Sequence, residues 1–481
     1  MEQPNLVAAI EALPAPALGK LIDHVGLEDA GEIVALATTE QIRRILDDDL
    51  WRSEGPGQDE SFAADRFALW LEIMLSPPCV SSRRRRCFWL DAAALKDDRV
   101  HGQRQRNSCT MDDLDETTRA VLARFRFDAA LSDRLRARLA ASGGESFTGQ
   151  RTGEVALPLP GDLKELPALD SSEGRELAAL GQAALAGGQA GVVILAGGMA
   201  TRFGGVVKAV VDVVPGHSFL RLKLADVERA AAASGGEVSV FLLGSHATSD
   251  VLRQAVGGLA PPGVRIEVLE QSVTLRLGAT GELFREQSGQ VSLCATGHGD
   301  VLPTLRTSGA LARFRRAGGR MLLVSNVDNL AATLDPRVLG AHMRSGKAVT
   351  VENVRKVPGD RGGIPARVDG HLQIVEEFRL PAGFDGASVP FFNTNTFVLD
   401  AEAIDRDFDL DWFLVRRKVE GREAIQPERL LGQVTAFLPT QFLVVPRTGR
   451  EGRFLPVKDR EELQMRMPEI RNLLAALGIS A

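Results

Sequence analysis

Residues 192–208, VVILAGGMATRFGGVVK, carry the pattern that best predicts the fold. The apolar run at 192–196 predicts a buried strand of a parallel sheet. Gly197 and Gly198 follow it directly, and glycines let backbone N–H groups approach a nucleotide closely. Lys208 lies within reach of such a loop as a point charge for phosphate. A tight turn without a ligand would leave the same pattern, so this stretch alone does not define a site.

Length and composition indicate a globular protein of two or three domains. The 481 residues are 44% hydrophobic and 25% charged, which is ordinary for such proteins. The net charge of −6 provides no basic excess for a nucleic-acid backbone, so no nucleic-acid partner is expected. The N-terminus lacks a signal-peptide pattern and no apolar run reaches 18 residues, so no membrane association is expected. Four irregularly spaced cysteines predict reduced thiols and a cytoplasmic protein.

Residues 1–141 predict a small all-α domain with an irregular insert near 76–110. Apolar residues recur at helical spacing along 1–75 and 112–141. The insert contains an arginine run at 83–86, and its Cys79, Cys87, His101 and Cys109 lack the close pairs of a zinc site. The short helices resemble the N-terminal part of a bacterial family of unknown function and, more loosely, the helical cytoplasmic domain of magnesium transporters. We expect a packing module, or a surface for a protein partner.

The remainder of the chain predicts a linker followed by an α/β domain. Residues 142–170 are rich in Gly, Ser and Pro, which predicts the linker. From 171 to 481, strand-like runs at 192–196, 238–243, 264–269, 321–324, 348–351 and 397–399 alternate with helical patterns such as 219–233 and 305–317. This rhythm predicts a mixed, mostly parallel sheet with helices on both faces. Asp369 and Gly370 predict a hairpin turn. A chain that begins at Ser171 is expected to fold alone and to bind its ligand.

Five further segments carry polar residues suited to a ligand. Asn326 and Asp328 follow the end of a predicted strand, where open α/β sheets bind ligands. Gln271 could read the edge of a base, and His298 lies between two glycines. Each has a plain structural alternative, as a strand cap, a turn or a surface residue. The segments are LEQS (269–272), GHGD (297–300), VSNVDNLAATLD (324–335), FFNTN (391–395) and RFLPVK (453–458).

In this order, these segments resemble the eukaryote-type UTP–glucose-1-phosphate uridylyltransferases, or UDP-glucose pyrophosphorylases, and related UDP-sugar pyrophosphorylases. The resemblance covers about residues 185–465 and includes EAIQPE at 423–428. It implies the Rossmann-like, GT-A-like mixed sheet of nucleotide-diphospho-sugar transferases for 171–481. It also implies transfer of uridylyl from UTP to a sugar 1-phosphate, with glucose as the expected sugar, and Mg²⁺ as cofactor.

The resemblance further implies roles for individual residues. Lys208, Lys458 and Asp328 would be catalytic, with Asp328 near Mg²⁺ and both lysines on the phosphates. The implied substrate-binding residues are Ala196, Gly197, Gly198, Gln271, Gly297, His298, Asn326, Glu352, Asn393 and Asn395.

Two departures from the family pattern keep other functions open. Ala200 occupies the place of the family's second loop glycine, and Val207 precedes Lys208 where the family has proline. Both favour a catalytically silent UDP-sugar sensor or scaffold, whereas the retained Asp328 and Lys458 favour an enzyme. A UDP-N-acetylhexosamine pyrophosphorylase is a further alternative, since motifs do not determine the shape of a sugar pocket.

Overall fold

The computed structural model describes residues 114–142, 153–200, 203, 205–259 and 261–479, together with residues 10, 13–27, 30–38, 41, 42, 45, 49, 51, 52, 61, 62 and 70. The chain forms two compact units, Met1–Ser108 and Cys109–Ala481. The insert expected near 76–110, with the four residues considered for zinc, lies outside the described residues.

The first unit is built on short helices, as the sequence predicts. Helix α2 (Ala15–Val25) begins after Pro14, and Gly26 ends it with a φ of 91°. Helix α3 (Gly31–Leu36) follows, and the short strands β1 (Trp51–Arg52) and β2 (Ser61–Phe62) form an antiparallel pair. The core around helices α2 and α3 contains Trp70, whose indole Nε1 donates a hydrogen bond of 2.6 Å to Asp49. The apolar face of these helices therefore has its own core within this unit.

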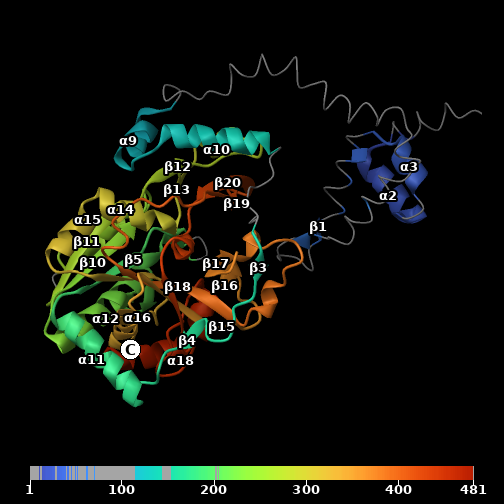
Figure 1. Cartoon of the computed structure of the whole chain (residues 1–481). Coiled ribbons are helices and arrows are strands. Elements are labelled where there is room, and N and C mark those ends of the chain that lie inside the picture. Colours follow the sequence, from blue (N-terminus) through green and yellow to red (C-terminus); the bar gives the residue numbers. More distant parts are fainter. Residues whose placement is uncertain are drawn as a thin grey trace, which may run out of the picture. The chain divides into compact units, whose positions relative to one another are not determined.

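The second unit is organised on an eight-stranded mixed sheet (Figure 1). Its order is β11 (Val264–Glu270), β10 (Val238–Gly244), β5 (Ala190–Leu195), β14 (Met321–Asn326), β18 (Phe391–Asp400), β15 (Val349–Arg355), β21 (Thr440–Val444) and β4 (Leu163–Glu165). Neighbouring strands pair in parallel except at β18, which is antiparallel to both β14 and β15. The predicted mixed sheet is confirmed.

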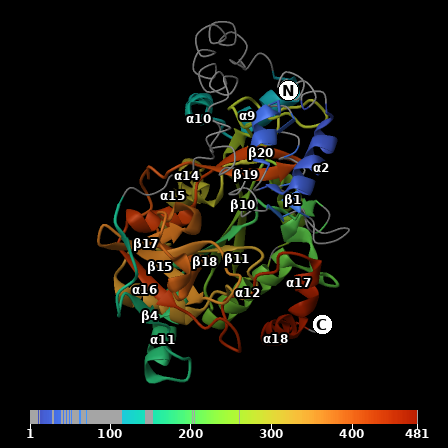
Figure 2. The same cartoon turned by 90° about the vertical axis from the view of Figure 1, so that its right-hand side faces the viewer.

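Alternate residues of the strands feed two cores, one on each face of the sheet, because side chains of a strand alternate in direction. On one face, Val192 and Ile194 pack with α11 (Ser172–Ala186), α12 (Phe219–Ser234), α16 (Pro336–Ser345) and α18 (Met467–Ala476). On the other face, Val193 packs with α14 (Val301–Thr307), α15 (Ala310–Arg316) and the 3₁₀ helix η8 (Leu431–Ala436). Figure 2 shows both layers from the side. The helix expected at 305–317 is interrupted, because Gly309 adopts a left-handed φ of 73° between α14 and α15.

Two glycines allow α11 and α16 to pack closely. A Cβ on Gly181 would lie 1.9 Å from the carbonyl oxygen of Pro336. A Cβ on Gly340 would lie 2.0 Å from the carbonyl oxygen of Leu177. Both positions therefore exclude any larger residue at this backbone separation.

A three-stranded antiparallel sheet joins β17 (His371–Glu376), β16 (Gly363–Val368) and β3 (Val155–Ala156). Asp369 and Gly370, with φ of 49° and 80°, connect β16 to β17 in the predicted hairpin. Both residues have positive φ, as a type I′ turn requires.

The sequence predicted domain boundaries at residues 141 and 171, whereas the structure divides the chain between Ser108 and Cys109. Helices α9 (Glu116–Arg124) and α10 (Ala129–Ala141) belong to the second unit. They cover the ribbons β12 (Val273–Leu275) with β13 (Leu293–Ala295) and β19 (Phe413–Val419) with β20 (Arg422–Glu428), as Figure 1 shows. Within the segment expected to be a linker, β4 adds a strand to the large sheet. Helical spacing predicted the two helices but not which core buries them, and the strand β4 was not predicted. Among the described residues, no helix combines the length and apolarity needed to cross a bilayer.

These contacts predict that a chain starting at Cys109 is more stable than one starting at Ser171. The shorter chain loses β4 and uncovers Val273, Leu275 and Leu277, and exposing each such side chain costs about 1.5–3 kcal/mol. We expect the shorter chain to unfold at a lower temperature or to aggregate. Circular dichroism melting curves and light scattering of both chains provide the measurement. Identical melting curves would contradict the assignment of α9, α10 and β4 to this core.

Candidate functional site

The candidate site is a cavity of about 740 Å³ at the C-terminal ends of the parallel strands. Leu195 ends β5, Asn326 ends β14, and Gln271 follows β11; all three line the cavity. The chain passes from β5 to β10 on one side, while β14 pairs with the other side of β5. This is a topological switch point, where open α/β sheets bind their ligands. Ribbons β12–β13 and β19–β20 provide the opposite wall.

The glycine loop after β5 lines the cavity with Gly197 and Gly198. Ala196 is buried, and its N–H donates to the carbonyl of Leu243 at 2.9 Å. The carbonyl of Gly197 accepts a hydrogen bond of 2.8 Å from Ser245 Oγ. A Cβ on Gly197 would lie 2.1 Å from Gln271 Nε2, so this glycine allows the amide to reach the loop. The predicted strand, loop and Gln271 therefore meet.

A short hairpin returns the chain to Lys208. Strand β6 (Met199–Ala200) pairs with β7 (Val206–Val207) in antiparallel register. Lys208 Nζ then lies 2.6 Å from Asp328 Oδ2, and both side chains line the cavity. Their side chains remain 14% and 22% exposed, so a ligand can reach both charges. The structure brings together two of the three residues expected to be catalytic.

Asp328 offers one carboxylate to a metal. Among the described residues, no group of three or more His, Cys, Asp or Glu is placed to hold a metal ion. One carboxylate fits Mg²⁺ that is bound mainly by phosphate oxygens and water. The donor set therefore suits a metal that arrives with a nucleotide.

His298 contributes a neutral imidazole to the cavity. Its Nδ1 accepts a hydrogen bond of 3.0 Å from the N–H of Leu431, which assigns the ring proton to Nε2. Burial lowers the pKa of His298 to about 4, so the ring stays uncharged at neutral pH. A Cβ on Gly297 would lie 2.4 Å from the carbonyl oxygen of Arg429. The first glycine of GHGD is thus explained by a close backbone contact as well as by its place in the cavity.

Asp300, the last residue of GHGD, is fully buried and connects three segments. Its Oδ2 accepts from the N–H of Ser272 at 2.6 Å and from Thr304 Oγ1 at 3.0 Å. Its Oδ1 accepts a hydrogen bond from the Arg429 guanidinium, which stacks on Trp412 at 4.5 Å. This carboxylate holds the LEQS and GHGD segments side by side.

The asparagines of FFNTN are connected to the cavity through Asn326. Asn395 Nδ2 donates to Asn326 Oδ1 at 3.0 Å, and its own N–H donates to Asn393 Oδ1 at 3.0 Å. Asn395 has a φ of 56°, the left-handed region that Asn tolerates better than most residues. Strained backbone of this kind collects at functional sites. Asn326 itself lines the cavity.

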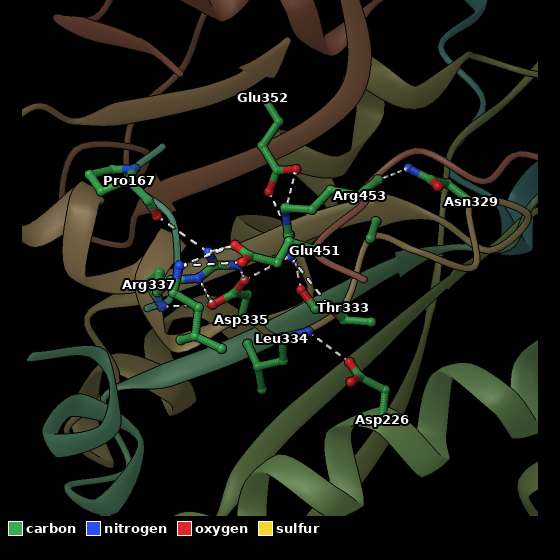
Figure 3. A network of polar contacts seen from close by, with 12 residues as sticks. Pro167, Asp226, Asn329, Thr333, Leu334, Asp335, Arg337, Glu352, Glu451 and Arg453 are labelled. Atoms are coloured by element: carbon green, nitrogen blue, oxygen red, sulfur yellow. Dashed lines mark hydrogen bonds and ion pairs between the residues drawn. The ribbon is translucent and has the colours of Figure 1, made fainter. Parts of the chain in front are cut away.

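Glu352 and Lys458 do not line the cavity. Glu352 is fully buried, and its two oxygens accept hydrogen bonds of 2.6 and 2.8 Å from Arg453 (Figure 3). A carboxylate bound in this way faces away from a substrate. The Lys458 side chain is exposed, but the preceding Val457 N–H donates to the carbonyl of Asp328 at 3.1 Å. The backbone just before Lys458 is therefore bonded to that of Asp328.

Several cavity residues were not predicted from the sequence. The polar segment SHATS at 245–249 directly follows strand β10, and this signal could have identified His246. Burial, with a smaller effect of Arg276, lowers the pKa of His246 to about 4, and its buried Nδ1 has no hydrogen-bond partner. The other unpredicted polar residues are Ser245, Arg276, Glu286, Arg417, Lys418, Gln426 and Glu428. Gln426 and Glu428 belong to EAIQPE, whose order resembled the family without indicating a contact.

Comparisons with known proteins agree with this geometry. A family model described as UTP–glucose-1-phosphate uridylyltransferase matches residues 162–476, and a family of unknown function matches residues 1–78. The UTP–glucose-1-phosphate uridylyltransferase of Hordeum vulgare is 27% identical over 299 residues, or 59% of this chain and 62% of that protein. The Saccharomyces cerevisiae enzyme of the same name is 27% identical, over 56% of this chain and 58% of that protein. The chain thus spans about three fifths of these relatives.

Solved structures show the same fold. The uridine diphosphate N-acetylglucosamine pyrophosphorylase of Trypanosoma brucei superposes with a TM-score of 0.57 at 22% identity, over 75% of this chain and 80% of that one. A variant of UDP-glucose pyrophosphorylase from Leishmania major gives 0.56 at 22% identity, over 73% and 78%. With the family model covering most of the second unit, the chain belongs to the UTP–glucose-1-phosphate uridylyltransferase family.

Proposed function

We propose that this protein makes a UDP-sugar and pyrophosphate from UTP and a sugar 1-phosphate. The observation that carries the proposal is the Lys208–Asp328 pair, facing the glycine loop and Gln271 across one cavity at the switch point of the sheet. Family membership supports the same reaction. Glucose is the proposed sugar, because the relatives carry that substrate in their names.

The uracil would occupy the side of the cavity formed by the loop after β5 and by Gln271. A side-chain amide offers a donor and an acceptor, which matches the alternating edge of uracil. The backbone of Gly197 and Gly198 is accessible here, and Gly297 lines the same side. The sugar phosphate would then lie towards His298 and Asn326, whose Nε2 proton and amide suit sugar hydroxyls.

The reaction would proceed by in-line displacement. A phosphate oxygen of the sugar 1-phosphate attacks the α-phosphorus of UTP, and the bond from that phosphorus to the pyrophosphate oxygen breaks. The attacking oxygen is already anionic, so no general base is needed. Lys208 and Lys458 would stabilise the negative charge that moves onto the leaving group. Mg²⁺, held by Asp328 and the phosphates, would neutralise further charge and orient the triphosphate.

We further propose that the protein is cytoplasmic and that its first unit binds a protein partner. A cytoplasmic location is consistent with the free buried thiol of Cys294, whose pKa burial raises to about 12. The helices of the first unit would provide the surface for a protein partner. Glu352 is left out of the proposed substrate contacts, because both of its oxygens are bound by Arg453.

The direct test is pyrophosphate release from UTP and Mg²⁺ with glucose 1-phosphate, galactose 1-phosphate and N-acetylglucosamine 1-phosphate. We expect turnover to be fastest with glucose 1-phosphate and to stop when Mg²⁺ is chelated. Turnover with N-acetylglucosamine 1-phosphate alone would assign a hexosamine enzyme. Binding of UDP-glucose without turnover of any sugar phosphate would favour the sensor.

Replacing Asp328→Asn should abolish most turnover while UTP binding is less affected. The change preserves the shape of the side chain but removes the anion that pairs with Lys208 and would hold the metal. Steady-state kinetics and calorimetric UTP titration give the two quantities. Glu469→Gln, on the exposed face of α18, is the matched control and should behave as the unaltered protein. Unchanged turnover in Asp328→Asn would leave this residue with a structural role alone.

Replacing Lys458→Ala should lower turnover by about 10²-fold and leave the fold intact. A positive charge beside the leaving group in the closed complex is typically worth about this factor, and an exposed side chain contributes little to stability. Lys458→Arg should recover part of the rate, since a planar fork replaces a point charge imperfectly. Lys347→Ala, another exposed lysine, is the control. Near-normal turnover in Lys458→Ala would remove this lysine from the catalytic set.

A further inference from the structure

The turn after α9 lies outside the region that the family model matches, yet it packs against the cavity. The model begins at residue 162, whereas this turn comprises residues 125 and 126 and follows Arg124, the last residue of α9. Phe125 is 2% exposed, and its carbonyl accepts a hydrogen bond of 2.9 Å from the N–H of Val273. Val273 is two residues beyond Gln271, so the turn is bonded to the segment that carries the amide.

The side chain of Phe125 also contacts the cavity wall. Its ring meets that of His246 edge to face, with centroids 6.3 Å apart. His246 lines the cavity, and its buried Nδ1 is without a hydrogen-bond partner. The phenylalanine thus supports a ring that lines the cavity.

Arg126 completes the connection from the other side of the same segment. Its Nη2 donates to the carbonyl of Glu270 and, at 3.0 Å, to Thr304 Oγ1. Thr304 in turn donates to Asp300, which accepts from the N–H of Ser272. Residues 270, 272 and 273 are therefore all held, on both sides of Gln271, by bonds that lead to this turn or to its partners.

The turn is held in its own place by charge. Arg124 pairs with Asp250 at 2.5 Å and with Glu270 at 2.6 Å. Arg126 has a φ of 50°, a strained value for arginine that the surrounding contacts must maintain. Such strain, together with the exposure of Arg126, argues for a role other than stability of the core.

We propose that Phe125 and Arg126 are positioning residues that hold Gln271 and His246 for recognition of the uracil base of UTP. This inference rests on the proposed function, because uracil is the ligand assigned to that side of the cavity. The turn would thus make base selection depend on a segment that precedes the family-matching region. Neither residue would contact the reacting atoms.

The test compares Arg126→Ala with Arg134→Ala, an exposed arginine of α10 that serves as the matched control. Arg126→Ala should raise the KM for UTP about tenfold and reduce the preference for UTP over CTP, because small displacements of a binding group weaken binding strongly. The KM for the sugar 1-phosphate and the melting temperature should stay unchanged. Phe125→Leu, which keeps an apolar side chain, should also raise the KM for UTP and reduce the preference for UTP over CTP. Arg126→Lys should restore part of the UTP affinity that Arg126→Ala loses.

Hydrogen exchange provides a readout that needs no catalysis. The amides of residues 271–273 should exchange several-fold faster in Arg126→Ala than in the unaltered protein or in Arg134→Ala. Equal increases in KM for both substrates, or unchanged exchange, would overturn the proposal. If the unaltered protein neither binds nor turns over UTP, the proposed function fails. The exchange result then decides alone whether the turn positions this segment.

Discussion

The buried ion pair between Glu352 and Arg453 is the interaction on which the arrangement of the site depends (Figure 3). Glu352 lies in β15, and Arg453 begins the segment that ends at Lys458. The guanidinium also donates to the carbonyl of Thr333 at 3.0 Å. Breaking a buried pair of this kind leaves one uncompensated charge and costs about 3–5 kcal/mol. The pair therefore fixes the C-terminal segment against the sheet.

From that anchor, a chain of polar contacts runs to the cavity. Asn329 Oδ1 accepts from the N–H of Leu455 at 2.8 Å, and Asn329 Nδ2 donates to the carbonyl of Arg453 at 3.3 Å. The buried Lys223 bonds the same segment on both sides of Asn329, because it donates to Ser325 Oγ at 3.0 Å and to the carbonyl of Ala332. Burial lowers the pKa of Lys223 to about 8, so this amine carries less positive charge than a surface lysine near that pH. Asp328 is thus held between two segments whose own polar groups are satisfied.

The two sides of the cavity are supported differently. On the side proposed to bind phosphate (the phosphate side), the supports belong to segments that the family model matches, and they act through buried charge. On the side proposed to bind the base (the base side), the end of α9 and the turn after it, both outside that region, contribute a phenylalanine and two arginines. Surface ion pairs are individually weak, so the base side is the more deformable of the two. Under the proposed function, base recognition could therefore change while the phosphate side is retained.

The sequence by itself determined the local elements and the membership of the family. Apolar runs predicted β5, β10, β11 and β14, because buried parallel strands need continuous apolar residues. Asp369 and Gly370 predicted their hairpin, because few residues tolerate two successive positive φ angles. The family-like motifs predicted that Gly197, Gln271, Lys208 and Asp328 belong to one site, and all four line one cavity. All of these follow from local conformation or from the common edge at which parallel strands end.

Only the tertiary structure decided which groups are paired and which face the ligand. The family resemblance implied that Glu352 binds substrate, but in β15 its carboxylate binds Arg453, 101 residues away along the chain. The helices at 116–141 read as part of a separate domain, yet their apolar faces are buried against ribbons that begin at residue 273. His246 follows β10 in a polar segment, but only the fold shows that it lines the cavity and that Phe125 packs against its ring. Side-chain partners distant in sequence leave no periodicity, because they are selected by packing and charge compensation after the strands have assembled.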